Sequence, residues 1–177
     1  MNIAGNEKNK NDLIEQPVAD FIFITSVKAD LNLISNLLLE KEFASLKNNI
    51  RALEISNLNS SAQIDNYVLK TINFAKVVVL RLFGDKGTWN YGIEQLLNWQ
   101  AANKKRKIVI LSGTLDQEVS LCEISSIDKN ITLNISRLLR SGGLDNYRKF
   151  LNCLNYLVVD EKSVSYTHLT LPTSSWV

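Results

Sequence analysis

Hydrophobic residues along this chain fall into short unbroken runs that alternate with longer segments in which they recur every three or four positions. The runs cover residues 20–25, 50–55, 77–82 and 108–111. Runs of this length, rich in Val, Ile, Leu and Phe, are typical of strands buried on both faces of a parallel sheet. We therefore predict four strands, and we place the weaker run, 50–55, nearer an edge of the sheet.

Helical spacing marks the segments between and after these runs. Helices are predicted over residues 28–46, from the Ser60-x-x-Gln63 capping box to about residue 72, from Thr88 as N-cap to about residue 103, and over 131–139 and 145–158, with an uncertain segment at 117–127. Strands that alternate with helices form βαβ units with right-handed crossovers. The fold class is therefore α/β: a three-layer, Rossmann-like or flavodoxin-like domain with a mainly parallel four-stranded sheet in the order 2-1-3-4 and extra C-terminal helices.

The segment from residue 76 to 99 holds the candidate working surface. Its strand, 77–82, carries one charge near the carboxyl end, Arg81, and Gly84 and Gly87 shape the turn that follows. Ligands of open parallel sheets bind outside the carboxyl ends of the strands. We therefore name Arg81, Gly84, Thr88 and Tyr91 as a candidate ligand or partner surface.

Alternatives stay open for these side chains. Arg81 is expected to serve function, and the alternative is an internal ion pair with Asp85 or Glu94. Trp89 is expected in the core, whereas Tyr91 and Trp99 lie off the inner stripe and could be exposed, or packed on a neighbouring domain.

Composition limits the class of protein. The 177 residues are enough for one domain, with 45% hydrophobic and 21% charged residues. A formal net charge of +2 gives no sign of nucleic-acid binding. No apolar run is long enough to span a membrane, and the two cysteines are expected as buried thiols. We expect a cytoplasmic protein.

The two ends of the chain differ from the domain, which we place at residues 20–160. Residues 1–19 are expected to be a flexible lead-in. Residues 163–177 lose all charge, and residues 164–173 resemble the translation of a transposase adapter used in DNA library preparation, so we expect a non-native tail rather than a genuine C-terminal strand. The only histidine, His168, lies in this tail, which leaves the rest of the chain without an imidazole.

The residues indicate no catalytic or metal site. The turn from Gly84 to Gly87 matches neither the P-loop nor the dinucleotide-binding pattern. It could still hold a small anion at a helix N-terminus, or it could be a simple tight turn. No Ser or Cys has a visible base to activate it.

Several motifs resemble the N-terminal domain of the large subunit of aerobic cobaltochelatase (CobN-type), over roughly residues 16–158. They are Val79-Leu-Arg-Leu-Phe-Gly84, Trp89-x-Tyr91-Gly92-x-Glu94-x-Leu96, Ala19-Asp20, Leu111-x-Gly113-Thr114 and Leu139-Arg140-x-Gly142-Gly143-x-x-Asn146. Phe83 and Asp85 depart from the family's pattern, which has a second consecutive glycine. The large subunit of magnesium chelatase is the competing resemblance.

The resemblance implies a fragment of a large tetrapyrrole-binding subunit. Its family inserts Co²⁺ into a corrin precursor of cobalamin, while separate AAA-type subunits use ATP and Mg²⁺. The family's chelation residues lie outside these motifs, so no catalytic residue is carried over and the fragment itself is expected to be non-catalytic, with no cofactor of its own. Its expected partners are the remaining domains of the subunit, the ATPase subunits and the corrin. The other function class is an independent α/β module that binds a small anion at the turn 84–88.

Overall fold

A computed structural model of the chain describes residues 2–3 and 12–158. Its sheet runs in the order β1-β3-β2-β4-β5, and every neighbouring pair is parallel. The strands are β1 (Asn2–Ile3), β2 (Phe21–Thr25), β3 (Ile50–Glu54), β4 (Val77–Leu82) and β5 (Lys107–Ser112). The four predicted strands and their order are confirmed, and β1 is an additional edge strand that the sequence pattern did not reveal.

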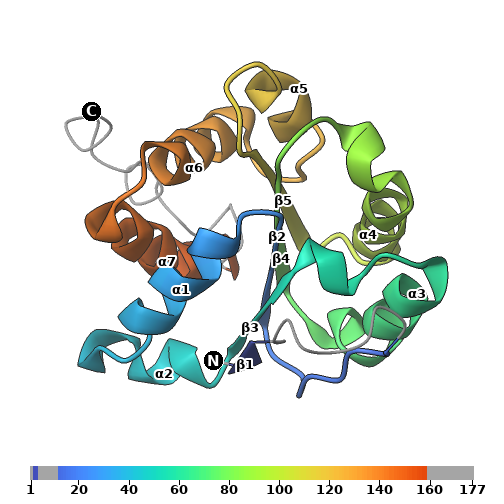
Figure 1. The fold of residues 1–177 in the computed structure, drawn as a ribbon, viewed down its shortest axis with the longest axis horizontal. Helices are drawn as coiled ribbons and strands as arrows, with labels where there is room; N and C mark the ends of the chain where they lie inside the picture. The colour runs from blue at the N-terminus through green and yellow to red at the C-terminus, as the bar shows by residue number, and fades with distance from the viewer. Residues whose placement is uncertain (1, 4–11, 159–177) are drawn as a thin grey trace.

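Helices cover both faces of this sheet, which confirms the three-layer α/β fold (Figure 1). In Figure 1, α1, α2, α6 and α7 lie on one side and α3 and α4 on the other, with α5 at one end. The α-helices are α1 (Lys28–Leu37), α2 (Ala44–Lys47), α3 (Ser61–Lys70), α4 (Asn90–Ala102), α5 (Glu118–Cys122), α6 (Lys129–Ser141) and α7 (Leu144–Val158). Four 3₁₀ turns also occur in the described part of the chain: η1 (Lys41–Phe43), η2 (Ile55–Asn57), η3 (Ile72–Phe74) and η4 (Lys86–Trp89).

Strand β4 separates the two hydrophobic cores. All six of its residues are buried. Val77 and Val79 contribute to the core beneath α1, α6 and α7, whereas Val78, Leu80 and Leu82 contribute to the core beneath α3 and α4. Because side chains alternate along a strand, Arg81 lies on the same face as Val77 and Val79.

The single helix predicted over 28–46 is wrong. Helix α1 ends at Leu37, and Glu40 adopts an extended conformation (φ −71°, ψ 146°) before η1 and α2. Leu38 and Phe43 are both buried in the same core. In a continuous helix these two residues would lie about 140° apart, so they could not both face the sheet. Ending α1 at Leu37 lets both residues face the sheet, although no Gly or Pro in residues 38–43 marks the end of the helix.

The described part of the predicted lead-in, residues 12–19, is packed against the domain. Ile14 and Gln16 are buried. The Gln16 side chain donates to the Ala52 carbonyl (3.1 Å) and accepts from the Tyr67 hydroxyl (2.6 Å). These contacts join the segment to β3 and α3, so the prediction of a flexible lead-in is wrong for these residues.

Several further details distinguish the structure from the sequence pattern. Trp99 is buried, in contrast to the exposure we allowed for it, and Val158 is exposed although it continues the apolar stripe of α7. The helix end at Gly142 has φ 73°, as expected for a glycine cap. The predicted non-native tail, 163–177, lies outside the described residues. Within the described part of the chain, no helix is long and apolar enough to cross a membrane.

Candidate functional site

Arg81 lies in the core beneath α1 and α7 rather than at an open crevice. Only 5% of its surface is exposed. Its Nη1 atom is 2.6 Å from Oδ1 of Asp30, a fully buried residue in the first turn of α1. The side chain therefore reaches sideways across the sheet face to a helix, instead of forward to solvent.

The Arg81–Asp30 pair belongs to a larger buried polar network. Asp30 also accepts hydrogen bonds from the hydroxyls of Thr25 (2.7 Å) and Tyr147, and Arg81 Nη1 contacts the Tyr147 hydroxyl at 3.1 Å. Burial, and then the charge of Asp30, raises the pKa of Tyr147, so the phenol stays protonated. The network joins β2, α1, β4 and α7. Among its atoms in the described chain, only Arg81 Nε is buried without a hydrogen-bond partner.

These contacts correct the sequence interpretation of Arg81. Its partner is Asp30, and neither Asp85 nor Glu94 takes part. The internal ion pair that we kept as the alternative is what the structure shows. Arg81 is thereby removed from the candidate surface and assigned to the core.

The turn that follows β4 is organised by Asp85. Its carboxylate accepts from the backbone N–H of Gly87 (2.9 Å) and caps η4. Our prediction of Thr88 as the N-cap of the following helix is wrong, because Trp89 occupies the N-cap position of α4 without a side-chain hydrogen bond. Gly84 has φ +107°, a conformation that side chains rarely adopt, and a Cβ there would lie 2.9 Å from the Thr88 hydroxyl oxygen. The turn is therefore compact and already holds a negative charge.

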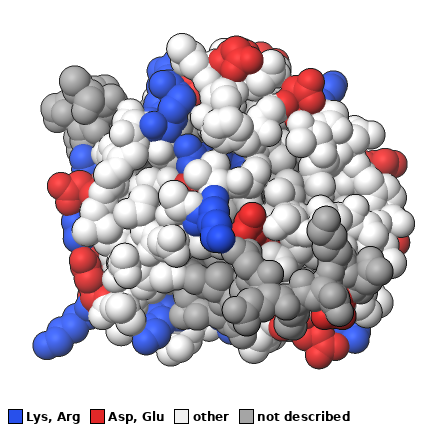
Figure 2. Space-filling view, viewed as in Figure 1, with Lys and Arg blue, Asp and Glu red and all other residues white. Residues whose placement is uncertain are grey.

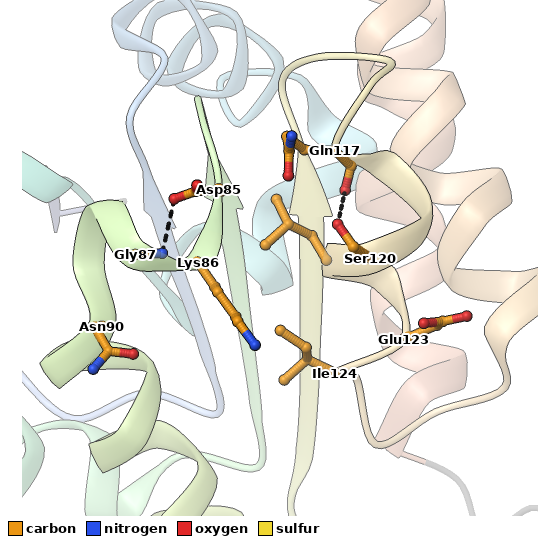
Figure 3. Close-up of a pocket in the computed structure, with 9 residues that line it drawn as sticks. Asp85, Lys86, Gly87, Asn90, Gln117, Ser120, Glu123 and Ile124 are labelled. Atoms are coloured by element: carbon orange, nitrogen blue, oxygen red, sulfur yellow. Dashed lines mark hydrogen bonds between the residues drawn. The ribbon is translucent and has the colours of Figure 1, made fainter.

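A groove lies between this turn and α5 (Figure 3). Its volume is about 690 Å³, and its walls come from two segments that are about 30 residues apart in the chain. The lining residues are Asp85, Lys86, Gly87 and Asn90 on one side and Gln117, Ser120, Leu121, Glu123 and Ile124 on the other. A second hollow of about 410 Å³ continues along α4 and shares Lys86, Asn90 and Ile124 with the first.

Lys86 is the central charge of this groove, and the sequence interpretation missed it. In Figure 3 its amino group extends between η4 and α5 toward Ile124. No ion pair joins Lys86 to another described residue, whereas Glu123 across the groove pairs with Lys129 (2.6 Å). Lys86 stands between Gly84 and Thr88, two of the four residues named as the candidate surface, so its position in this turn is the sequence signal that could have identified it.

Tyr91 serves a different contact. Its hydroxyl donates to Oδ1 of Asp65 on α3 (2.6 Å), and this hydrogen bond raises the pKa of Tyr91. The half-buried Trp89 donates its indole N–H to the Leu58 carbonyl (3.0 Å). Of the four candidate residues, only Gly84 and Thr88 therefore belong to the turn that borders the groove.

Polar and charged side chains on both walls of the groove offer contacts to a bound group. Residues 12–158 contain no group of three or more His, Cys, Asp or Glu side chains placed to hold a metal ion. Burial raises the pKa of Cys122 to about 11, so this thiol is protonated near neutral pH and is a weak nucleophile. An anion at the turn 84–88 would meet the Asp85 carboxylate, which already occupies the Gly87 N–H.

Comparison with known proteins identifies one relative by sequence and one by structure. No protein-family model matches the chain. The aerobic cobaltochelatase subunit CobN of Pseudomonas aeruginosa is 28% identical over 144 residues, which are 80% of this chain and 11% of the relative. The catalytic subunit of cobaltochelatase from Mycobacterium tuberculosis superposes with a TM-score of 0.57 at 21% identity, over 82% of this chain and 11% of that one.

The structural match shows a shared fold, and the sequence match extends over most of the described domain. This chain spans about a tenth of the length of either protein. The resemblance that the motifs predicted is thereby confirmed: over most of its length the chain is similar in sequence to the aerobic cobaltochelatase subunit CobN and similar in fold to the catalytic subunit of cobaltochelatase.

Proposed function

We propose that this domain is the N-terminal part of a large, tetrapyrrole-binding cobaltochelatase subunit, which inserts Co²⁺ into a corrin precursor during cobalamin biosynthesis. In this proposal separate AAA-type subunits hydrolyse ATP with Mg²⁺, and Co²⁺ is a substrate. The observation that carries the proposal is the 144-residue match to CobN, which covers 80% of this chain.

Within the parent subunit, the domain is proposed to bind other parts of the complex and not to perform the insertion itself. The described residues supply a groove lined by one cation, two carboxylates, two amides and one hydroxyl, but no metal-holding cluster. Such a surface can position a partner or limit access to the macrocycle, whereas a bound metal ion needs several ligands placed together, which the described residues do not provide.

Magnesium chelatase remains the second candidate for the parent enzyme, because the motifs also resemble its large subunit. The independent anion-binding module is less well supported, since Asp85 places a carboxylate where the anion would bind. A phosphate titration of the 177-residue chain, followed by NMR, tests that module directly. Saturable shifts at Gly84, Gly87 and Thr88 would favour it.

The proposal is tested by reconstitution of the full-length subunit with its ATPase subunits. We expect ATP-dependent insertion of Co²⁺ into a corrin substrate, seen as a change in the absorption spectrum, and no insertion of Mg²⁺ into a porphyrin. Insertion of Mg²⁺ alone would support the second candidate. Failure to insert either metal, with all subunits folded, would overturn the chelatase assignment.

A further inference from the structure

Three exposed apolar side chains follow the carboxyl ends of two neighbouring strands. They are Phe83 (59% exposed), which follows β4, and Leu115 (67%) and Val119 (51%), which follow β5. Strands β4 and β5 are neighbours and end at the same level, with Leu82 paired to Ser112. We call Phe83, Leu115 and Val119 the edge patch.

Phe83 is held in position although its ring is exposed. Its backbone N–H donates to the Ser26 hydroxyl (2.9 Å), and that hydroxyl donates to the Arg81 carbonyl (3.1 Å). The ring lies over Gly113, where an added Cβ would be 2.7 Å from Phe83 Cδ2. A backbone hydrogen bond and the absence of a side chain at Gly113 therefore hold in place an aromatic ring that faces solvent.

Leu115 and Val119 extend the patch onto α5. The Glu118 N–H donates to the Leu115 carbonyl (3.3 Å), which forms a turn that leads from Leu115 into α5. Glu118 itself is buried and contacts Arg140 of α6 at 3.3 Å, which fixes α5 in place. The residue after Val119, Ser120, lines the groove that holds Lys86.

Charged side chains surround this end of the molecule. Figure 2 shows basic side chains over α6 and acidic ones over α5. Apolar groups within a charged rim are the usual composition of a protein interface, where charged residues are depleted at the centre. Contiguous exposed apolar groups on a soluble domain mark surfaces that another molecule or domain covers.

We propose that the edge patch docks a later part of the same parent polypeptide, through apolar side chains that cover Phe83, Leu115 and Val119 and an acidic or carbonyl group that reaches Lys86. This inference rests on the proposed function, in which the domain is one piece of a large subunit. The length of the relatives supports the choice of occupant. This chain corresponds to only 11% of either cobaltochelatase protein, so nearly nine-tenths of such a subunit lies outside the domain and is tethered to it. A tethered partner is present at high effective concentration.

Radical footprinting of the wild-type full-length subunit tests the proposal without any mutation. Phe83 and Phe74 are the matched pair, because both are phenylalanines, 59% and 63% exposed in the domain, and Phe74 lies on η3 outside the patch. We expect oxidation of Phe83 to be several-fold slower than oxidation of Phe74. Equal oxidation of the two rings would overturn the proposal.

A second measurement identifies the occupant. In the full-length subunit, limited proteolysis should release the domain several-fold faster from the Phe83→Ser variant than from wild type, while Phe74→Ser leaves the rate unchanged. A wild-type dimer that Phe83→Ser converts to a monomer in light scattering would assign the patch to a second copy and overturn our choice. Footprinting and proteolysis do not depend on turnover. Protection of Phe83 without metal insertion would therefore refute only the proposed function, and insertion without protection would refute only the docking.

Discussion

Arg81 and Asp30 are buried together, and each depends on the other for its charge to be tolerated in the core. We predict that Arg81→Ala lowers the free energy of unfolding by about 3–5 kcal/mol, because it leaves Asp30 as an uncompensated buried charge. Urea denaturation measures this loss. Lys86→Ala is the control, since Lys86 is exposed and has no ion pair with a described residue; its effect should stay within about 0.5 kcal/mol.

The double variant Arg81→Ala, Asp30→Ala separates the ion pair from general packing. Its loss should be clearly smaller than the sum of the two single losses, because removal of both charges leaves neither unpaired. If Arg81→Ala changes stability by less than about 1 kcal/mol and yet abolishes activity of the full-length subunit, Arg81 acts in function and its assignment to the core is wrong.

The Tyr147 hydroxyl makes stability sensitive to alkaline pH. Burial raises its pKa above the ordinary value of 10.0, so above pH 10 the unfolded chain releases this proton while the folded chain keeps it. Stability from this group is fully present below pH 10 and is lost as pH rises toward the folded pKa, at up to about 1.4 kcal/mol per pH unit. Denaturation midpoints measured from pH 9 to 11 should fall less steeply in Tyr147→Phe than in wild type. Parallel curves would contradict this assignment.

For these buried side chains, the sequence indicated that a charged Arg81 interrupts an apolar strand, but it could not indicate which residues Arg81 contacts. A charge inside an apolar strand is visible in the pattern of residues. Asp30 lies 51 residues before Arg81 and Tyr147 lies 66 residues after it, so only the folded arrangement brings them together. Asp85 and Glu94, the alternative partners named from the sequence, lie 4 and 13 residues after Arg81.

Helix α3 begins with a complete capping box. The Ser60 hydroxyl accepts from the Gln63 N–H, and the Gln63 side chain accepts from the Ser60 N–H. We predict that Ser60→Ala lowers stability by about 1 kcal/mol. The adjacent Ser61→Ala is the matched control, since Ser61 is exposed and Ala is favourable inside a helix. Thermal denaturation of the two variants should differ in this direction; equal melting temperatures would show that the cap contributes little.

Gly92 in α4 makes room for the indole ring of Trp89. A Cβ at position 92 would lie 2.3 Å from the ring. We therefore predict that Gly92→Ala destabilises by about 1–3 kcal/mol, as overpacking does, although Ala is the better helix former. The Trp89 N–H bond to Leu58 should also be lost, with a shift in tryptophan fluorescence.

The Trp89→Ala variant provides the control for Gly92. With the ring removed, Gly92→Ala should become neutral or stabilising, and a cost that persists in the double variant would place the clash elsewhere. This contact gives a physical reason for the Trp-x-Tyr-Gly motif that indicated the family.

The strands and helix ends that the sequence predicted correctly are those determined by residues close together in the chain. The four main strands are continuous apolar runs, and the capping box stands in four consecutive residues. The break after α1 and the packing of residues 12–19 depend on burial against distant segments, so no local signal marks them. The groove was missed for the same reason, because one wall is α5, a helix of five residues with a weak pattern.

For the whole molecule, we predict that the 177-residue chain alone neither hydrolyses ATP nor inserts Co²⁺ into a corrin. Its sequence has no P-loop pattern, and its described residues hold no metal-binding cluster. Phosphate release and corrin absorbance measure the two activities, with the reconstituted full-length complex as the positive control. Turnover by the purified chain, retained at constant specific activity through further purification, would contradict the prediction.

The order of strands also determines when this domain can fold during synthesis. Strand β2 is made early and occupies the middle of the sheet, where residues 21–25 pair with residues 77–81 of β4. Half of the hydrogen-bonding capacity of β2 therefore stays unmet until β4 has left the ribosome. Pairings between distant segments form slowly, since the chain between them must be ordered first. The nascent chain consequently carries an apolar strand with an open edge while residues 26–82 are made, and this interval is when protection of the domain from aggregation matters most.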